Sequence, residues 1–130
     1  MNSMNKNKSK TTRILIADDE VEFASTLTNR LKLRGFATTI VNSGEDALDS
    51  IAQKVPDIVL LDLKMPDLDG LEVLARLREN HPDLKVIILT GHGSFESGCE
   101  GMNLGAFDYI MKPVEINLLV EKINEATMET

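Results

Sequence analysis

Short apolar runs alternate along the chain with longer segments in which apolar residues recur at helical spacing. The clearest short runs are 14–17, 58–61 and 86–89. Strands are predicted near 12–17, 36–41, 57–61, 84–89 and 107–111. Because strands that alternate with helices form β-α-β units, this pattern predicts an α/β fold with a parallel sheet covered on both faces.

The segments between these strands carry the residue spacing of helices. Apolar positions predicted to face inward form four stripes: Phe23, Ala24, Leu27 and Leu31; Ala47, Leu48, Ile51 and Ala52; Leu71, Leu74 and Leu77; and Ile116, Leu119, Val120 and Ile123. Gly35 is placed to end the first of these helices, and Ser43 to begin the second, which should stop before Pro56. The third helix is expected from about Gly70 to Asn80.

A weaker helix is predicted from Ser94 to Leu104. Glycines at 98 and 101 lower its intrinsic stability, so this segment is a candidate for movement. One side of it carries three apolar residues, Phe95, Cys99 and Met102.

Length and composition fit one globular domain. The chain has 130 residues, of which 42% are hydrophobic and 27% charged, as is ordinary for a folded protein. Residues 1–11, rich in Asn, Ser and Lys, are predicted to form a flexible tail, and residues 12–127 the domain. No apolar run approaches the roughly 20 residues of a membrane span. The first residues also lack the apolar stretch of a secretory signal, so a cytoplasmic protein without membrane contact is expected.

The charge balance argues against a nucleic-acid partner. With 14 basic and 21 acidic residues, the net charge is −7 at pH 7, which repels nucleic-acid phosphates. The single cysteine, Cys99, lacks the clustered Cys or His residues of a zinc site and reads as a small, partly buried apolar residue. We therefore expect no direct binding of nucleic acid.

Four of the predicted strands end at a residue with useful chemistry. Asp18 and Asp19 follow the first strand, Asp62 the third, Thr90 the fourth and Lys112 the fifth. Ligands of open parallel sheets bind beyond the carboxyl ends of the strands, so these residues are expected to converge there. Taken singly, Thr90 reads better as an ordinary strand-end threonine and Lys112 as an exposed lysine, and the acids also fit a solvated turn. Only the whole set indicates a site.

The acids in this set predict a metal ion. Asp18 and Asp19, with Asp62 on a neighbouring strand, would repel one another unless a proton or a cation neutralises them. A few hard oxygen ligands with retained water suit Mg²⁺, which also shares its coordination with phosphoryl groups. A solvated acidic turn is the alternative interpretation.

Asp62 is the best placed nucleophile among the acids. Asp57 precedes the third strand and would lie near the opposite edge of the sheet, and the two acids of 66–70 fall in a turn-forming run. A carboxylate that attacks phosphorus needs charge neutralisation on the phosphoryl oxygens. Mg²⁺, the Lys112 ammonium and the Thr90 hydroxyl would supply it.

Four blocks of sequence carry most of these residues: ILIADDE at 14–20, LLDLKMPDLDG at 60–70, LTG at 89–91 and GAFDYIMKP at 105–113. In their order and spacing they resemble the response-regulator receiver family of two-component signalling. The resemblance covers about residues 12–127.

The resemblance implies a single doubly wound, flavodoxin-like (βα)5 domain with a five-stranded parallel sheet of order 2-1-3-4-5. It implies that a sensor histidine kinase or phosphotransfer protein phosphorylates Asp62. Mg²⁺ would be held by Asp19, Asp62 and the Lys64 backbone carbonyl, with Asp18 acting mainly through bound water. It also implies a cis bond between Lys112 and Pro113.

The same resemblance implies a switch made by Thr90 and Tyr109. The hydroxyl would move toward the phosphoryl group and the aromatic ring would turn inward, although Tyr109 also reads as an ordinary edge-strand aromatic residue. The change would alter the surface of residues 95–127, and this surface would bind a downstream protein. A phosphorylation-dependent homodimer is a further possibility that the resemblance implies. The domain would not be an enzyme in its own right, since it would catalyse only its own phosphorylation and dephosphorylation.

Two further residues near the site are assigned roles by position. Gly91 fits the need for a small residue beside the phosphoryl entrance. Lys64 and His92 lie two residues after Asp62 and Thr90. We hypothesise that this basic pair slows or redirects water attack on the phosphoryl group, and ordinary solvent exposure is the alternative for each.

Two other functions fit the sequence less well. Aspartyl phosphohydrolases often carry a second acid two residues after the nucleophile, where this chain has Lys64, and they insert a cap that is missing here. A flavin carrier would need a phosphate cradle after the first strand, but that loop is acidic. Residues 91–94 lack the ending of a P-loop.

The sequence leaves open the kinase, the signal, and whether the chain acts alone, in a phosphorelay, or as part of a longer regulator or hybrid kinase.

Overall fold

The computed structural model describes residues 11–91 and 95–128, and in them five parallel strands form one sheet. The strands are β1 (Arg13–Ala17), β2 (Ala37–Val41), β3 (Ile58–Asp62), β4 (Lys85–Thr90) and β5 (Asp108–Met111). The helices are α2 (Val21–Leu33), α3 (Gly44–Gln53), α4 (Gly70–Asn80), α5 (Phe95–Asn103) and α6 (Ile116–Met128). The strand order β2-β1-β3-β4-β5 confirms the predicted topology, and each strand starts or ends within one residue of its expected position.

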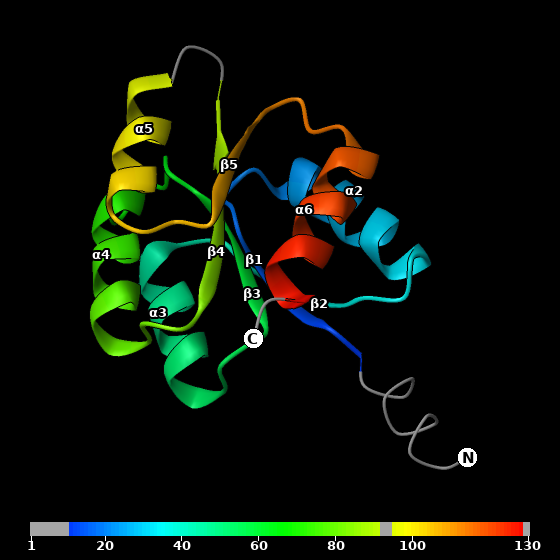
Figure 1. The fold of residues 1–130 in the computed structure, drawn as a ribbon, viewed down its shortest axis with the longest axis horizontal. Helices are drawn as coiled ribbons and strands as arrows, with labels where there is room; N and C mark the ends of the chain where they lie inside the picture. Colours follow the sequence, from blue (N-terminus) through cyan, green and yellow to red (C-terminus); the bar gives the residue numbers. More distant parts are fainter. Residues whose placement is uncertain (1–10, 92–94, 129–130) are drawn as a thin grey trace.

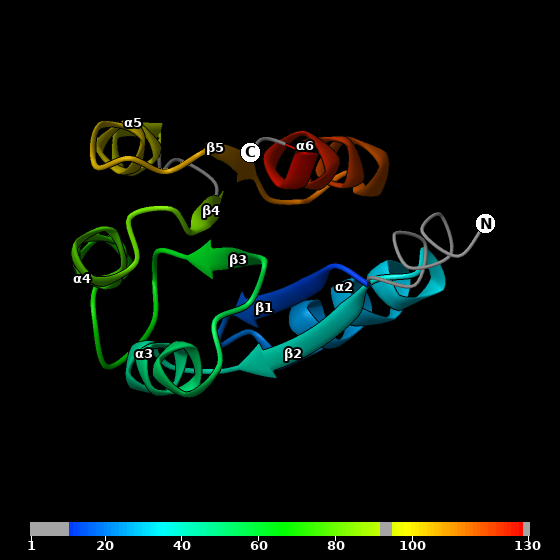
Figure 2. The same ribbon diagram turned by 60° about the horizontal axis from the view of Figure 1, so that its bottom comes forward.

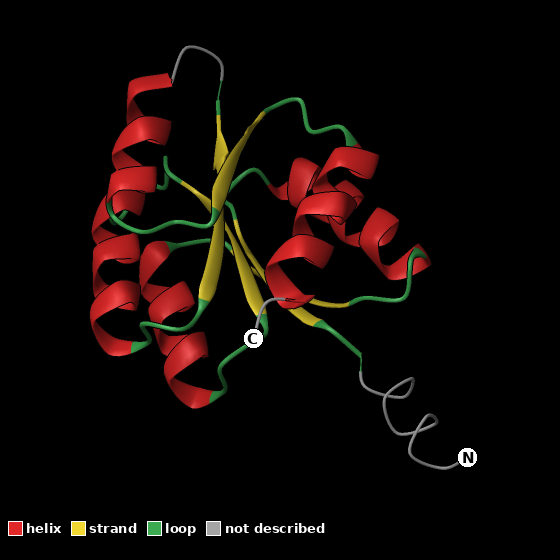
Figure 3. Cartoon of the chain, viewed as in Figure 1, coloured by secondary structure: helices red, strands yellow, loops and turns green. Residues whose placement is uncertain are grey.

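The helices lie on both faces of the sheet. Figures 1 and 2 show α3, α4 and α5 on one face and α2 with α6 on the other, and Figure 3 shows the strands as the layer between them. Parallel strands are joined by crossover helices, and these crossovers are right-handed. The chain runs from β1 to β2 in one direction along the sheet and then to β3, β4 and β5 in the other, so the crossover helices lie on both faces. The fold is therefore doubly wound, as predicted.

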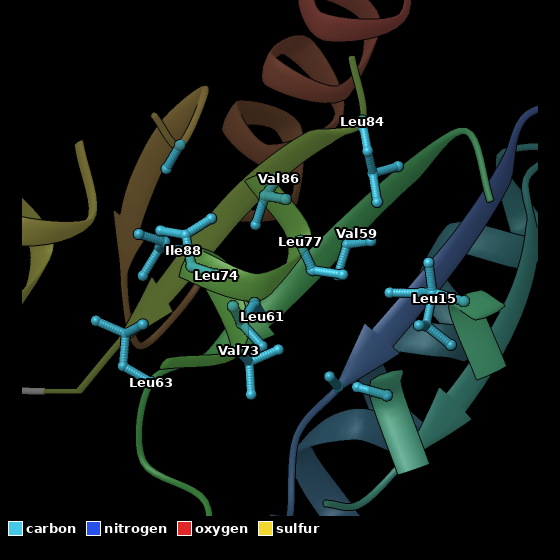
Figure 4. Close-up of a cluster of buried hydrophobic side chains, with 14 of the residues drawn as sticks. Leu15, Val59, Leu61, Leu63, Val73, Leu74, Leu77, Leu84, Val86 and Ile88 are labelled. Atoms are coloured by element: carbon cyan, nitrogen blue, oxygen red, sulfur yellow. The ribbon is translucent and has the colours of Figure 1, made fainter. Parts of the chain in front are cut away.

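The sheet separates two hydrophobic cores, and β3 contributes to both. Val59 and Leu61 face α3 and α4, in the cluster drawn in Figure 4, while Ile58 and Leu60 face α2 and α6. All four side chains are fully buried. A strand buried on both faces reads as a continuous apolar run, which explains why 58–61 carries no polar residue before Asp62.

The predicted helix ends follow from local hydrogen bonding. After α2, Gly35 has a φ of +91°, its N–H donates to the Lys32 carbonyl at 3.0 Å, and the Phe36 N–H donates to the Leu31 carbonyl at 3.2 Å. This is the paired pattern of a glycine-ended helix. Ser43 begins α3, because its Oγ accepts the Asp46 N–H at 3.1 Å.

One expectation about a helix face is wrong. Ala52 is exposed on α3 instead of facing inward. On α5, Met102 is 38% exposed, and Gly98 and Gly101 are the buried residues. The helix presents glycines to the sheet because a Cβ at Gly101 would lie 2.0 Å from the Ile88 side chain.

The predicted flexible tail lies outside the described residues except for Thr11. Within residues 11–91 and 95–128, no helix has both the length and the apolar character that crossing a membrane requires.

Candidate functional site

The polar residues at the strand ends meet at the carboxyl edge of the sheet. Asp18 follows β1, Asp62 ends β3, Thr90 ends β4 and Lys112 follows β5. Asp18, Asp62 and Thr90 are 0%, 5% and 1% exposed. Because β1, β3 and β4 are neighbours in the sheet, the topology brings these residues together although they lie far apart in the sequence.

Asp62 is a buried carboxylate with few compensating contacts. Burial raises the pKa of its carboxyl from 3.8 to about 6, and the neighbouring Asp18 adds to the rise. The Lys64 N–H, which donates to Oδ1 at 3.1 Å, and the Lys112 ammonium act in the opposite direction. The carboxylate therefore gains from any further positive charge that reaches it.

Hydrogen bonds to its backbone and to one carboxylate oxygen hold Asp18 in place. Its Oδ1 accepts the Glu20 N–H at 2.8 Å, and its backbone carbonyl accepts a hydrogen bond from the Asn42 side chain at 2.9 Å. Its own N–H donates to the Val41 carbonyl at 3.0 Å. These bonds orient the second oxygen, Oδ2, toward Lys112.

The Lys112 ammonium lies among three carboxylates and one aromatic ring. Its Nζ is 2.9 Å from Asp18 Oδ2 and 3.7 Å from Asp62 Oδ2, and it forms an ion pair with Glu20 Oε1. The ring centroid of Phe23 is 4.3 Å away. Burial alone lowers the pKa of Lys112, but the hydrogen bonds to Glu20 and Asp18 outweigh it, so its pKa is raised and the side chain stays charged.

Thr90 brings an unused hydroxyl to the site. Its side chain is buried, and Oγ1 has no hydrogen-bond partner among the described residues. A buried hydroxyl without a partner is costly, so its presence calls for an explanation. At Gly91, which lines the hollows beside Thr90, a Cβ would meet nothing within 4 Å, and the role of Gly91 at the phosphoryl entrance stays a prediction.

Tyr109 lies on the same face of the sheet as Thr90. It pairs with Ile88 on β4, two residues before Thr90, and strand side chains alternate between faces. Its half-buried ring packs against α5, where a Cβ at Gly98 would lie 2.8 Å from the ring. The two residues are therefore placed where a shared movement can connect them, and their switch role stays a prediction.

The loop that follows Asp62 is held by its own backbone and by a neighbouring helix. A Cβ at Gly70 would lie 2.4 Å from Leu63 Cα, and the Gly70 N–H donates to the Leu63 carbonyl at 3.0 Å. Asp67 caps α3, since its two oxygens accept the N–H groups of Glu45 and Gly44, both at 2.9 Å, and these bonds lower the pKa of Asp67. The predicted turn and cap roles of the loop acids are confirmed, although Asp67 caps a different helix from its own.

Two hollows open at this edge and meet at Asp62. One is lined by Asp19, Glu20, Phe23, Lys112 and Pro113, and the other by Asp69, Leu71, Thr90, Ser97 and Glu100, and both include Asp62, Lys64 and Gly91. Lys64 is exposed beside them. The other basic residue assigned to this entrance, His92, lies outside the described residues.

The acids of this edge fit a divalent cation. Carboxylate oxygens of Asp18, Glu20 and Asp62 lie within 4.8 Å of one another, and hard oxygen donors of this kind suit Mg²⁺. Asp19 is exposed and lines the same hollow as Asp62. The ligand set of Asp19, Asp62 and the Lys64 carbonyl stays a prediction.

Two residues of the site were missed by the sequence reasoning. Glu20 directly follows the acid pair, so its position in the chain was a usable signal. Phe23 was assigned to the apolar stripe of α2, and nothing in the stripe distinguishes a core residue from one that faces Lys112.

A sequence model of the response regulator receiver domain matches residues 14–124. The chain belongs to the response regulator receiver domain family. It is 36% identical over 111 residues to regulatory protein LuxO of Vibrio vulnificus (strain YJ016), covering 85% of this chain and 24% of that protein. The receiver domain thus spans about a quarter of the length of this relative.

Solved receiver domains share the fold. The receiver domain of NtrX from Brucella abortus superposes with a TM-score of 0.86 at 31% identity, over 90% of this chain and 99% of that chain. A CheY-like receiver domain protein from Methanospirillum hungatei JF-1 gives 0.87 at 34% identity, over 92% and 96%. The predicted family and its flavodoxin-like fold are therefore confirmed, and this receiver domain is a phosphoryl-accepting switch module of two-component signalling.

Proposed function

We propose that Asp62 is the phosphoryl acceptor of this receiver domain. A carboxylate oxygen of Asp62 attacks the phosphorus of a phosphohistidine on a histidine kinase or phosphotransfer protein. The P–O bond to Asp62 forms as the P–N bond breaks, and its electron pair returns to the imidazole. The observation that carries the proposal is the burial of Asp62 between Asp18 and Lys112, with the unpartnered Thr90 hydroxyl on the next strand.

Each surrounding group has a distinct task. Lys112 neutralises one phosphoryl oxygen, and the Thr90 hydroxyl donates to another. Asp19, Asp62 and the Lys64 carbonyl would hold Mg²⁺, with Asp18 supporting it through water. When bound, the ion offsets the negative charge that gathers on the phosphoryl group. The domain itself thus catalyses only its own loading and the later hydrolysis of its aspartyl phosphate.

The output surface is proposed to lie on α5, β5 and α6. Five large apolar side chains are exposed on or next to these elements. Met102, Leu104, Met111 and Leu118 are each between 38% and 43% exposed, and Met128 is 78% exposed. Exposed apolar groups of this kind support docking of a downstream protein or of a second copy of the domain. Tyr109, which lies between the site and α5, is the proposed link. We place this signalling in the cytoplasm, where a histidine kinase carries its phosphoryl group.

Intact mass measurement tests the acceptor. The wild type, Asp62→Asn and the control Asp57→Asn are incubated with Mg²⁺ and acetyl phosphate. Asp57 belongs to the other end of the same strand, where its Oδ2 accepts the Arg13 N–H at 2.7 Å. We expect one phosphoryl adduct on the wild type and on Asp57→Asn, none on Asp62→Asn, and none without Mg²⁺. An adduct that persists in Asp62→Asn would refute the assignment.

A further inference from the structure

Lys112 has two kinds of carboxylate partner, which differ in how firmly they are held. The carboxylate of Asp18 is 0% exposed and that of Asp62 is 7% exposed, whereas that of Glu20 is 61% exposed. A solvent-exposed ion pair is worth little and is exchanged easily, because water replaces either partner at small cost. Glu20 is therefore the replaceable partner of an otherwise fixed ammonium.

Glu20 does not cap the helix that it begins. It is the N-cap residue of α2, a position where Ser, Thr, Asp or Asn side chains commonly accept a hydrogen bond from the first helical turn. Its side chain makes no such bond and pairs with Lys112 instead. The ion pair thus connects the start of α2 with the residue that follows β5, across the hollow that contains Asp62.

We propose that Glu20 is a positioning residue that occupies the phosphoryl-binding side of Lys112 and must release it when a phosphoryl group reaches Asp62. The inference rests on the proposed function, in which Lys112 neutralises a phosphoryl oxygen. A phosphoryl oxygen and the Glu20 carboxylate compete for the same ammonium. Glu20 therefore slows loading of the domain by anionic donors and weakens binding of phosphoryl analogues.

A competing role for Glu20 is metal binding, because its carboxylate belongs to the same acidic cluster. The two roles predict opposite results when the charge is removed. If Glu20 is a metal ligand, Glu20→Gln weakens Mg²⁺ binding and slows phosphorylation. If Glu20 competes with the phosphoryl group for Lys112, Glu20→Gln leaves the Mg²⁺ requirement unchanged and speeds phosphorylation.

The experiment compares initial phosphorylation rates by intact mass, with saturating Mg²⁺ and subsaturating acetyl phosphate. We expect Glu20→Gln to react about two- to fivefold faster than the wild type, a range that an exposed ion pair allows. Glu20→Asp keeps the charge but shortens the side chain, so it should also react faster. Glu22→Gln removes the same charge from the first turn of α2, where Glu22 is exposed, and should change the rate less than twofold.

A double-mutant cycle shows whether the effect passes through Lys112. In a Lys112→Ala background, which is itself expected to react slowly, Glu20→Gln should no longer increase the rate. The same gain in both backgrounds would mean simple charge repulsion and would overturn the proposal. So would an unchanged rate, or a slower rate with a raised Mg²⁺ requirement.

A titration with fluoroberyllate gives the matching equilibrium result. Tighter binding by Glu20→Gln than by the wild type or Glu22→Gln supports competition for Lys112, and equal binding contradicts it. A wild type that takes up no phosphoryl group refutes the proposed function itself. A wild type that is phosphorylated, with unchanged Glu20 variants, refutes only this inference.

Discussion

The two ends of the central sheet differ in how far their polar groups are paired. At the amino end, the terminal nitrogens of the Arg78 guanidinium donate to the carbonyls of Gly105 and His81, both at 3.0 Å, and to that of Leu84, and only the buried Nε of Arg78 has no partner among the described residues. Asp57 accepts the Arg13 N–H at 2.7 Å. At the carboxyl end, the Thr90 hydroxyl has no partner and the pKa of Asp62 is raised.

This difference separates stability from function within one sheet. Paired polar groups at the amino end stabilise the fold, while the unpaired groups at the carboxyl end reduce stability until a phosphoryl group or cation provides partners. Substitutions at the amino end should therefore lower stability. Substitutions of the unpaired groups Asp62 and Thr90 at the carboxyl end should preserve or raise stability and impair phosphorylation.

The largest effect is expected at Arg78. Arg78→Ala should lower the free energy of unfolding by about 2–4 kcal/mol, because three backbone carbonyls lose a charged donor. Urea unfolding measures the loss. Arg76→Ala is the matched control in the same helix. Among the described residues Arg76 forms only an exposed i,i+4 pair with Glu72 at 3.0 Å, so its loss should cost about 0.3–0.5 kcal/mol. Equal losses in the two variants would contradict the role given to the amino end.

Asp62→Asn should stabilise the domain in a pH-dependent way. The pKa of Asp62 is about 6 in the folded state and 3.8 as its ordinary value, so the folded state binds this proton more tightly than the unfolded state. The resulting stabilisation is fully present below pH 3.8 and is lost as the pH rises through about 6. The Asn variant does not ionise, so its advantage over the wild type should grow by about 2 kcal/mol between pH 4 and pH 8. Thermal unfolding in EDTA at both pH values measures it. A constant difference would show that the carboxylate is not destabilised by burial.

Mg²⁺ should act against the stability advantage of Asp62→Asn over the wild type. Adding the ion at pH 8 should raise the melting temperature of the wild type and leave that of Asp62→Asn nearly unchanged, since a ligand stabilises only the state that binds it. Asp57→Asn is the control for the other end of the strand and should respond to Mg²⁺ as the wild type does. An equal response by Asp62→Asn would place the ion elsewhere.

The smallest expected change in stability is at Thr90. Thr90→Val removes the unpartnered hydroxyl while keeping the shape of the side chain. The free energy of unfolding should therefore be unchanged or rise by up to about 1 kcal/mol. Phosphorylation by acetyl phosphate should nevertheless slow. Thr28→Val in α2 is the control, because its hydroxyl is also buried without a partner but lies away from the site. A similar loss of phosphorylation in both variants would show that Thr90 acts only through the packing.

Much of this arrangement was predictable because it depends on patterns within the chain. Apolar runs define the strands, and a parallel sheet brings their carboxyl ends together, so Asp18, Asp62, Thr90 and Lys112 were found as a set. The partner of Lys112 was not predictable in the same way. Whether the Glu20 side chain turns to its own helix or across the hollow depends on β5, which follows almost ninety residues later.

The helix α5 shows a second limit of sequence patterns. An apolar stripe identifies a buried face only where side chains fill the gap between helix and sheet. Here Gly98 and Gly101 allow close approach to Tyr109 and Ile88, and Met102 is turned outward. Residues without side chains leave no trace in an apolar stripe, so the stripe did not show which face of α5 meets the sheet.

The close approach of Gly70 to Leu63 limits how this site can evolve. The obstacle to a side chain at position 70 is backbone, so no change in a neighbouring side chain relieves it. Lys64, exposed in the same loop, meets no such limit. In a lineage under selection for switching, we expect position 64 to be free to diverge while position 70 stays glycine. The path of the loop would then be inherited long after its sequence has changed.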